Sequence, residues 1–174
     1  MSTDNPMPGL VPRTRPLESA AFDVPHPRPF LCDTRIDGGD LSRAVPHVSN
    51  IEFIRWIDRA AELHADDLGY TRQAMVDRGI MWFVVRHEID YLAEAWADDE
   101  LVVATWVRDM RRVKSWRDTL VVRPADKTIL CRAATLWVLV DLATRRPTRI
   151  DDVMARSFSP LKAAVGTQRC STSP

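Results

Sequence analysis

The pattern of apolar and polar positions changes character once along the chain, at about residue 80. Before that point, apolar residues recur at intervals of three and four, which places them on one wide face of a helix. Ser49 is suited to cap the start of this helix, Glu52 completes a capping box, and Gly69 fits the position after its end. The pattern predicts one long helix with an apolar face made by Ile51, Ile54, Ile57, Ala61 and Leu68, flanked by Phe53, Ala60 and Leu63.

After residue 80 the chain is rich in Val, Ile, Leu, Trp and Thr, interrupted by short turn-like segments. Such runs are typical of strands, and short connections between them favour antiparallel neighbours. The expected class is therefore α+β, with an antiparallel sheet of five or six strands and the long helix on its concave face. Strands are expected at 30–36, 81–91, 100–110, 115–123, 127–142 and 148–150, and a second short helix at 71–78.

Both ends of the chain differ from this central part. Residues 1–28 contain many prolines, which block helices and central strands, so this arm is expected to be extended or disordered. Residues 159–174 are small and polar and are expected to form a flexible tail. The predicted domain is 29–158.

Composition narrows the range of partners. The 174 residues include 24 Lys and Arg against 24 Asp and Glu, so nothing draws the whole molecule toward nucleic acid or an anionic membrane. The arm lacks the apolar core of a signal peptide, and no apolar run is long enough to span a bilayer. The three cysteines, Cys32, Cys131 and Cys170, are far apart, which disfavours both zinc and a disulfide framework. We expect a reduced, cytoplasmic protein.

The segment from His47 to Ala60 resembles a motif of hotdog-fold acyl thioesterases, HVNN-x-x-Y-x-x-W/F-x-E-x-A. This group includes 4-hydroxybenzoyl-CoA thioesterase-like enzymes and plant acyl-ACP thioesterases. Segments 88–95, 98–101 and 144–150 are similar to later parts of the same family, in the same order. The resemblance implies a hotdog fold, in which a sheet wraps around a central helix. It also implies a homodimer or a dimer of dimers, and hydrolysis of acyl-CoA or acyl-ACP without metal or redox cofactor.

The chain departs from that family just before the helix. Many members carry a catalytic aspartate seven residues before the position of Asn50, and this chain has Arg43 there. Asp40 lies three residues earlier, and the loop would have to be re-routed to present it. Of the plant-like Asp-x-Asn-x-His pattern only His47 is present. This departure supports an alternative, a non-catalytic hotdog module that binds acyl thioesters or acts in assembly.

The start of the helix is the expected chemical centre. Its first turn offers unpaired N–H groups and a partial positive charge, which suit the oxyanion of a thioester under attack. A general base must lie nearby, and an arginine cannot serve as one. The catalytic candidates are His47, Asn50, Arg43, Asp40 and Asp58, with Glu62 further along. Each also has a structural interpretation: a bonded loop histidine, a first-turn amide, a solvated arginine, a turn cap, or helix-surface ion pairs.

A basic turn between two predicted strands supplies a second set of candidates. Arginine and lysine clusters suit the phosphates of CoA, although charged hairpin tips are also common without a ligand. The expected substrate-binding residues are Ser49 at the helix start and Arg111, Arg112, Lys114 and Ser115 at the turn. The tryptophans on the strands, Trp82, Trp106, Trp116 and Trp137, are expected in the core, at a dimer contact or along an acyl tunnel.

Overall fold

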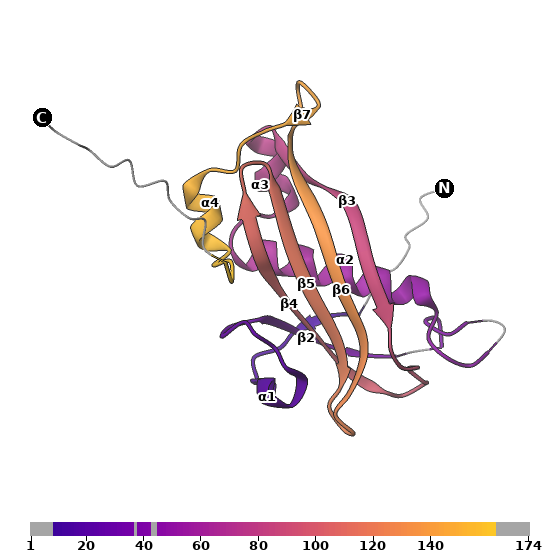
Figure 1. Ribbon diagram of the computed structural model, residues 1–174. Helices are drawn as coiled ribbons and strands as arrows, with labels where there is room; N and C mark the ends of the chain where they lie inside the picture. The colour runs from indigo at the N-terminus through magenta and orange to yellow at the C-terminus, as the bar shows by residue number, and fades with distance from the viewer. Residues whose placement is uncertain (1–8, 37, 43–44, 163–174) are drawn as a thin grey trace, which may run out of the picture.

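A computed structural model describes residues 9–162 apart from 37, 43 and 44. Its main element is a curled antiparallel sheet in the order β1-β2-β4-β5-β6-β3, with β7 paired to β6. The long helix α2 lies across one face of this sheet (Figure 1). The strands are β1 Val11–Pro12, β2 Phe30–Arg35, β3 Ile80–Tyr91, β4 Glu100–Arg111, β5 Lys114–Arg123, β6 Thr128–Asp141 and β7 Arg146–Pro147; the helices are α1 Ser19–Phe22, α2 Asn50–Asp67, α3 Arg72–Asp77 and α4 Asp152–Ser157.

The α+β prediction of a sheet around a central helix is confirmed, and the long strands lie where the sequence predicts them. The last short strand is displaced: β7 covers Arg146–Pro147 and pairs with Val140 and Asp141, whereas 148–150 form no strand. The pattern also missed β1, α1 and α4, which are too short to show a period. The second helix is confirmed, and Gly69 and Gly79 take the left-handed conformations that end α2 and α3, with φ of 82° and 70°.

The buried face of α2 agrees with the predicted one at Ile57 and Ala61 but differs from it in the first turns of the helix. Phe53, Trp56, Ile57 and Ala60 are buried against β2, β4, β5 and β6. Ile51 and Ile54 instead lie on the outer side, with 60% and 37% of their surface exposed. The predicted apolar face does not include Trp56, whose large ring sets which side of the helix turns inward. The helix thus keeps apolar side chains on a second, uncovered side.

The N-terminal segment is attached to the outer face of the sheet, opposite α2. Between residues 9 and 28 the chain has little regular structure, but it is packed rather than disordered. Leu17 and Phe22 are buried against Val102, Trp106 and Leu120. Strand β1 also pairs with β2. Of the two forms expected for the arm, extended or disordered, these residues take the extended one, because a few widely spaced apolar side chains are enough to hold a proline-rich segment against the sheet.

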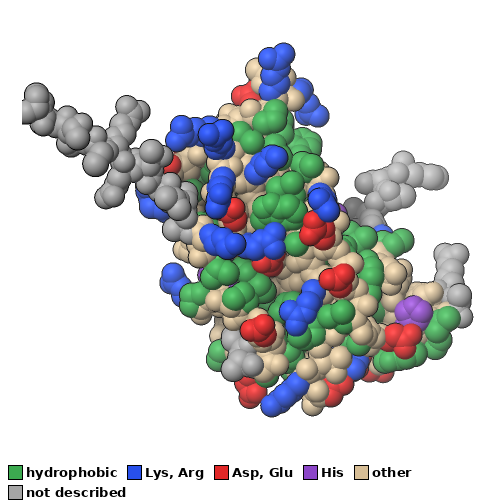
Figure 2. Space-filling view, in the orientation of Figure 1, with side chains coloured by type: hydrophobic (Ala, Val, Ile, Leu, Met, Phe, Trp, Pro, Cys, Tyr) green, Lys and Arg blue, Asp and Glu red, His purple; other side chains and the backbone are tan. Residues whose placement is uncertain are grey.

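The outer face of the sheet carries mixed charge. Figure 2 shows basic and acidic side chains interspersed over it, with apolar side chains between them. Two of the ion pairs there are Arg86 with Glu88 at 2.9 Å and Arg108 with Asp118 at 3.1 Å. Inside, Cys32 and Cys131 are buried free thiols whose pKa burial raises to about 12. Cys170 lies outside the described residues.

Candidate active site

The start of α2 is capped by Ser49, as the sequence predicts, but not by a full capping box. The Ser49 hydroxyl accepts from the amide of Ile51 at 3.3 Å. The Ser49 amide donates to the carbonyl of Asp40 at 2.9 Å, so it has no need of Glu52. The Glu52 carboxylate binds Arg55 at 2.9 Å instead. The cap therefore depends on the preceding loop, and this loop brings Asp40 to the N-terminal end of the helix.

Two loops meet at the N-terminal end of α2. The loop before α2 folds back on itself through a bridge between Leu41 and Val48, which places Asp40 beside Ser49. The loop after β3 joins it, because Val48 donates to the carbonyl of Ala95 at 2.8 Å. Four predicted residues, Asp40, His47, Ser49 and Asn50, thus lie together at the helix end. Arg43 lies outside the described residues.

His47 occupies the joint between the two loops. Its backbone bridges Trp96, and its ring lies edge-on to the Trp96 indole, with 6.4 Å between centroids and an interplanar angle of 81°. The side chain is half-buried, and its Nδ1 is a buried atom with no hydrogen-bond partner in the described part of the chain. Buried polar atoms are rarely left unpaired, so this nitrogen is placed to bind a group that the described residues do not supply.

Asn50, the first residue of α2, carries the second unpaired group. No acceptor among the described residues takes the hydrogen of its backbone amide. Its carbonyl accepts from the Tyr91 hydroxyl at 3.3 Å, which ties the first turn of α2 to the end of β3. Partial burial raises the pKa of Tyr91, so the phenol stays protonated and keeps donating. The amide at a helix N-terminus is a suitable donor to a developing oxyanion.

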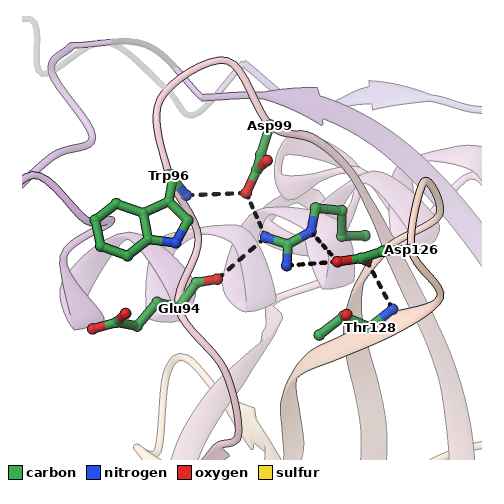
Figure 3. Close-up of polar contacts among 6 residues, drawn as sticks. Glu94, Trp96, Asp99, Asp126 and Thr128 are labelled. Carbon is green, nitrogen blue, oxygen red and sulfur yellow. Dashed lines mark hydrogen bonds and ion pairs between the residues drawn. The ribbon is translucent and has the colours of Figure 1, made fainter.

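An ionic network holds the second loop in place (Figure 3). Arg123 on β5 donates to Asp99 at 2.7 Å and to the carbonyl of Glu94 at 3.3 Å. Asp99 in turn accepts from the Trp96 amide at 3.0 Å. On its other side Arg123 binds Asp126 through Nε and Nη2, at 3.0 and 2.9 Å, and holds the pKa of that carboxyl down, at about 2. The network fixes the loop that supports His47.

Asp58 lies further along α2, away from the two loops and beside a cavity. Eight residues of helix separate it from Asn50, a rise of about 12 Å. It lines a cavity of about 400 Å³ between the second half of α2 and strands β3 to β6. Partial burial and the neighbouring Glu62 raise its pKa, and His87 on β3 opposes this. Burial lowers the pKa of His87, whose Nδ1 lies 3.0 Å from the Thr135 hydroxyl.

The sequence of this chain matches known proteins over most of the folded region. The profile of the thioesterase-like superfamily matches residues 33–158, more than half of the chain. The chain belongs to this superfamily. Its match to an acyl-[acyl-carrier-protein] hydrolase of Cuphea viscosissima has 28% identity over 102 residues, 59% of this chain and 24% of that protein. A palmitoyl-acyl carrier protein thioesterase of Gossypium hirsutum matches at the same identity and coverage. The chain spans about a quarter of the length of these relatives.

Solved structures of thioesterases share the fold. A 1,4-dihydroxy-2-naphthoyl-CoA thioesterase from Synechocystis superposes with a TM-score of 0.70 at 19% identity, over 77% of this chain and 98% of that one. A 12:0-ACP thioesterase from Umbellularia californica gives 0.67 at 23% identity, over 80% of this chain and 55% of that one. The hotdog fold expected from the sequence is confirmed.

The basic turn of this thioesterase-like chain does not join the helix start. Arg111, Arg112 and Lys114 lie at the β4–β5 tip, at the end of the sheet near α3 and α4 (Figure 1). The Arg112 carbonyl accepts there from the Ile150 amide at 2.7 Å, and Arg111 binds Asp109 at 3.1 Å. Ser115 is buried and lines the cavity that Asp58 borders. Within one chain, the predicted substrate-binding residues are thus divided between the two ends of α2.

Sequence reasoning missed the residues that hold the site together. Tyr91, Trp96 and Arg123 come from strands and a loop far from the helix motif, and only the folded chain brings them to it. In the sequence, the ionic network is indicated only by Arg123 and Asp126, which lie three residues apart across a predicted turn and so can pair. Trp82 and Trp137 line the cavity, and Trp106 is buried in the core, as the sequence predicts for some of these side chains. None of the described helices is long and apolar enough to cross a membrane, and no metal-binding group of three or more side chains occurs among the described residues.

Proposed function

We propose that this chain hydrolyses acyl thioesters, acyl-CoA or acyl-ACP, at the start of α2. The observation that carries the proposal is a pair of unpaired groups in a member of the thioesterase-like superfamily. One is the Asn50 amide, which has no acceptor among the described residues, and the other is the buried Nδ1 of His47. A donor for an oxyanion and a candidate base thus lie at the same helix end.

In the proposed reaction the thioester carbonyl oxygen accepts a hydrogen bond from the Asn50 amide. Water attacks the carbonyl carbon while the His47 imidazole takes a proton from it, and the carbonyl oxygen becomes an oxyanion at the positive end of the helix dipole. The intermediate collapses with cleavage of the C–S bond, and the leaving thiolate receives the proton. Products are the free acid and the thiol. One oxyanion donor is worth about 2.7–4 kcal/mol in such reactions.

The aspartates have secondary places in this scheme. Asp40 is held beside the helix cap by its backbone, so its carboxylate is the second candidate base or the group that orients His47. Asp58 is too far along α2 to reach a carbonyl bound at the same chain's Asn50. Its contribution to this reaction comes through the cavity or through a second copy of the chain.

We also propose that the working form is a homodimer, or a dimer of dimers. Strand β3 ends the order of the sheet on one side and is twelve residues long. Phe83, Val84 and Val85 on it are exposed, as are Ile51 and Ile54 on the neighbouring side of α2. A long strand edge with exposed apolar side chains along its first half is a ready site for pairing with another strand. A second copy at this edge would border the cavity, which Phe83 and Val84 also line.

The test is release of free thiol from a panel of short, long and aromatic acyl-CoAs and acyl-ACPs. We expect turnover of at least one of them, and a loss of about 100-fold or more in kcat/KM for His47→Gln. Asp58→Asn should lose less than His47→Gln does. Asp77→Asn, at an exposed carboxylate on α3 that accepts from Gln73, serves as the control and should stay within about twofold.

Two results would contradict the proposal. Absence of thiol release from every member of the panel would favour a module that binds thioesters without cleaving them. The substitution Asn50→Pro removes the backbone amide hydrogen. Full activity of both His47→Gln and Asn50→Pro would place the reaction elsewhere.

A further inference from the structure

The cavity beside Asp58 has a wall of apolar side chains and a polar floor. It is partly open to solvent and has a volume of about 400 Å³, enough for a small ligand or for the end of a longer one. Its apolar lining includes Met75, Met81, Trp82, Phe83 and Phe158. The helix α2 contributes Asp58, Glu62 and Asp66 to one side, and β5 and β6 contribute the floor.

Arg117 is the unusual residue of this floor. Only 5% of its surface is exposed, and its Nη1 donates to His64 Nδ1 at 2.9 Å and to the Thr105 hydroxyl at 3.3 Å. Its guanidinium carbon lies over the Phe158 ring, 5.9 Å from the centroid. Nε and Nη2 bond to no described atom, and no carboxylate among the described residues lies within 4.0 Å of the guanidinium.

Both of the bonded neighbours of Arg117 are neutral. Burial and the adjacent guanidinium lower the pKa of His64 to about 3, so its Nδ1 accepts from Arg117 without adding charge. Burial lowers the pKa of Arg117 itself to about 10, which still leaves it charged near neutral pH. The charge is therefore buried and has no counter-ion within the described chain.

Other half-buried arginines of this chain are paired. Arg59 binds Glu62 at 2.7 Å, and Arg123 binds Asp99 at 2.7 Å and Asp126 at 2.9 Å. Burying a cation without a paired anion is costly, and removing one partner of a buried pair leaves such an unpaired charge. Arg117 is therefore placed to bind an anion, and no described residue supplies that anion.

Two further donors lie on the same face of the sheet. Ser115 is two positions before Arg117 on β5, and Trp137 pairs directly with Ser115 across β5 and β6. All three line the cavity, since alternate residues of a strand share a face. Trp137 Nε1 is buried and has no partner among the described residues. The polar side chains of Arg117, Trp137 and Ser115 thus lie side by side along one cavity.

We propose that this floor binds the carboxylate at the far end of the acyl group, so that the preferred substrates are thioesters of dicarboxylic acids whose carbonyl is held at Asn50 of the second copy in the proposed dimer. Within one chain the two places are too far apart, because His64, which accepts from Arg117, lies fourteen residues after Asn50 on α2, a rise of about 21 Å. The guanidinium fork matches a carboxylate, and the apolar wall matches the methylene chain that leads to it. Glu62 on the opposite wall is already bound to Arg59 and Arg72, at 2.7 and 3.3 Å. This inference rests on the proposed thioester hydrolysis and adds the class of acyl group.

The test compares CoA thioesters of dicarboxylic acids with those of monocarboxylic acids of the same carbon number, over a series of lengths. We expect the full-length protein to favour the dicarboxylic member about tenfold or more in kcat/KM at one length. Arg117→Met, which replaces the cation by an apolar side chain, should lower that ratio to one or below. Arg35→Met, at an exposed arginine on β2, is the matched control and should leave the ratio unchanged.

A second measurement does not depend on turnover. Free suberate should raise the Tm of the unmodified protein more than octanoate does, and this difference should vanish in Arg117→Met. A ratio near one at every length, with plain acyl-CoAs still hydrolysed and no effect of suberate on Tm, overturns the dicarboxylate inference and leaves the proposed function intact. Loss of turnover on every thioester, with the suberate effect intact, contradicts the proposed function and supports the Arg117 site.

Discussion

At the level of single residues, His64 shows how burial sets the state of a titratable group. Its imidazole stacks on Phe30 at 5.1 Å and accepts from Arg117, so both its environment and its bond favour the neutral form. A histidine in water has a pKa of 6.5 and is partly charged near neutral pH, whereas burial lowers the pKa of His64 to about 3. The folded chain therefore holds a histidine that resists protonation.

The lowered pKa of His64 predicts that the protein loses stability in acid. Between about pH 6.5 and pH 3 the unfolded chain protonates His64 and the folded chain does not, so the free energy of unfolding falls as the pH falls. The slope from this group is at most about 1.4 kcal/mol per pH unit. His64→Gln keeps an acceptor without this proton, and urea unfolding at pH 7 and pH 5 should show a smaller drop for it. An equal drop in both proteins would contradict the assignment.

At the level of elements, the loop after β3 depends on ions rather than on regular structure. Asp99 joins Arg123 to the Trp96 amide, so one carboxylate holds both the strand and the loop. Its neighbour Asp98 is exposed and lies 3.4 Å from Arg35, an ion pair open to water. Two adjacent aspartates thus have very different surroundings.

We expect Asp99→Asn to reduce the free energy of unfolding by about 1–3 kcal/mol, because it leaves Arg123 with one carboxylate fewer. If the site is at the start of α2, kcat/KM should fall as well, since the loop supports His47. Asp98→Asn is the matched control and should change stability by less than about 0.5 kcal/mol. Chemical denaturation and the thiol-release assay measure both quantities, and equal effects of the two variants would show that the network does not hold the loop.

The N-terminal segment makes a second prediction at this level. Phe22 is only 2% exposed and packs on the outer face of the sheet, whereas Val11 on β1 is 62% exposed. Phe22→Ala should therefore lower the free energy of unfolding by about 3–5 kcal/mol, and Val11→Ala by less than about 0.5 kcal/mol. Denaturant titration of both variants decides this, and a loss below about 1 kcal/mol for Phe22→Ala would mean that the segment is only loosely attached.

At the level of the whole molecule, the edge of β3 is the surface through which we propose that two copies associate. Val85 lies at an irregularity of the β3–β6 pairing, between Val84 and Arg86, and 60% of its surface is exposed. We expect Val85→Arg to convert the proposed dimer to a monomer, because it places a charge within the apolar contact. Val153→Arg, at an exposed valine on α4, should leave the assembly unchanged. Light scattering after gel filtration gives the mass, and a monomeric unmodified protein would contradict the dimer.

The sequence predicts the long elements well and their surroundings poorly. The helix at 50–67 and the strands after residue 80 have clear periods and clear ends, so local chemistry is enough to find them. The predicted buried face of α2 is right for Ile57 and Ala61 and wrong for Ile51 and Ile54, which follow the helical period while lying on the outer side. Asp40, His47, Ser49 and Asn50 could be predicted together because they are neighbours in sequence. Arg117, His64 and Tyr91 could not, since only the strand register brings them into place.

The two margins of the sheet are unequal, and this limits how copies can join. On one margin β1 covers part of β2 and the N-terminal segment passes over it, while on the other margin no described strand pairs with the outer side of β3. A sheet open at both margins can add copies without end and grow into a fibre. A sheet open at one margin closes after a single self-pairing about a two-fold axis. If two copies pair through β3, that edge is used up, and any larger assembly of this chain must use a different surface.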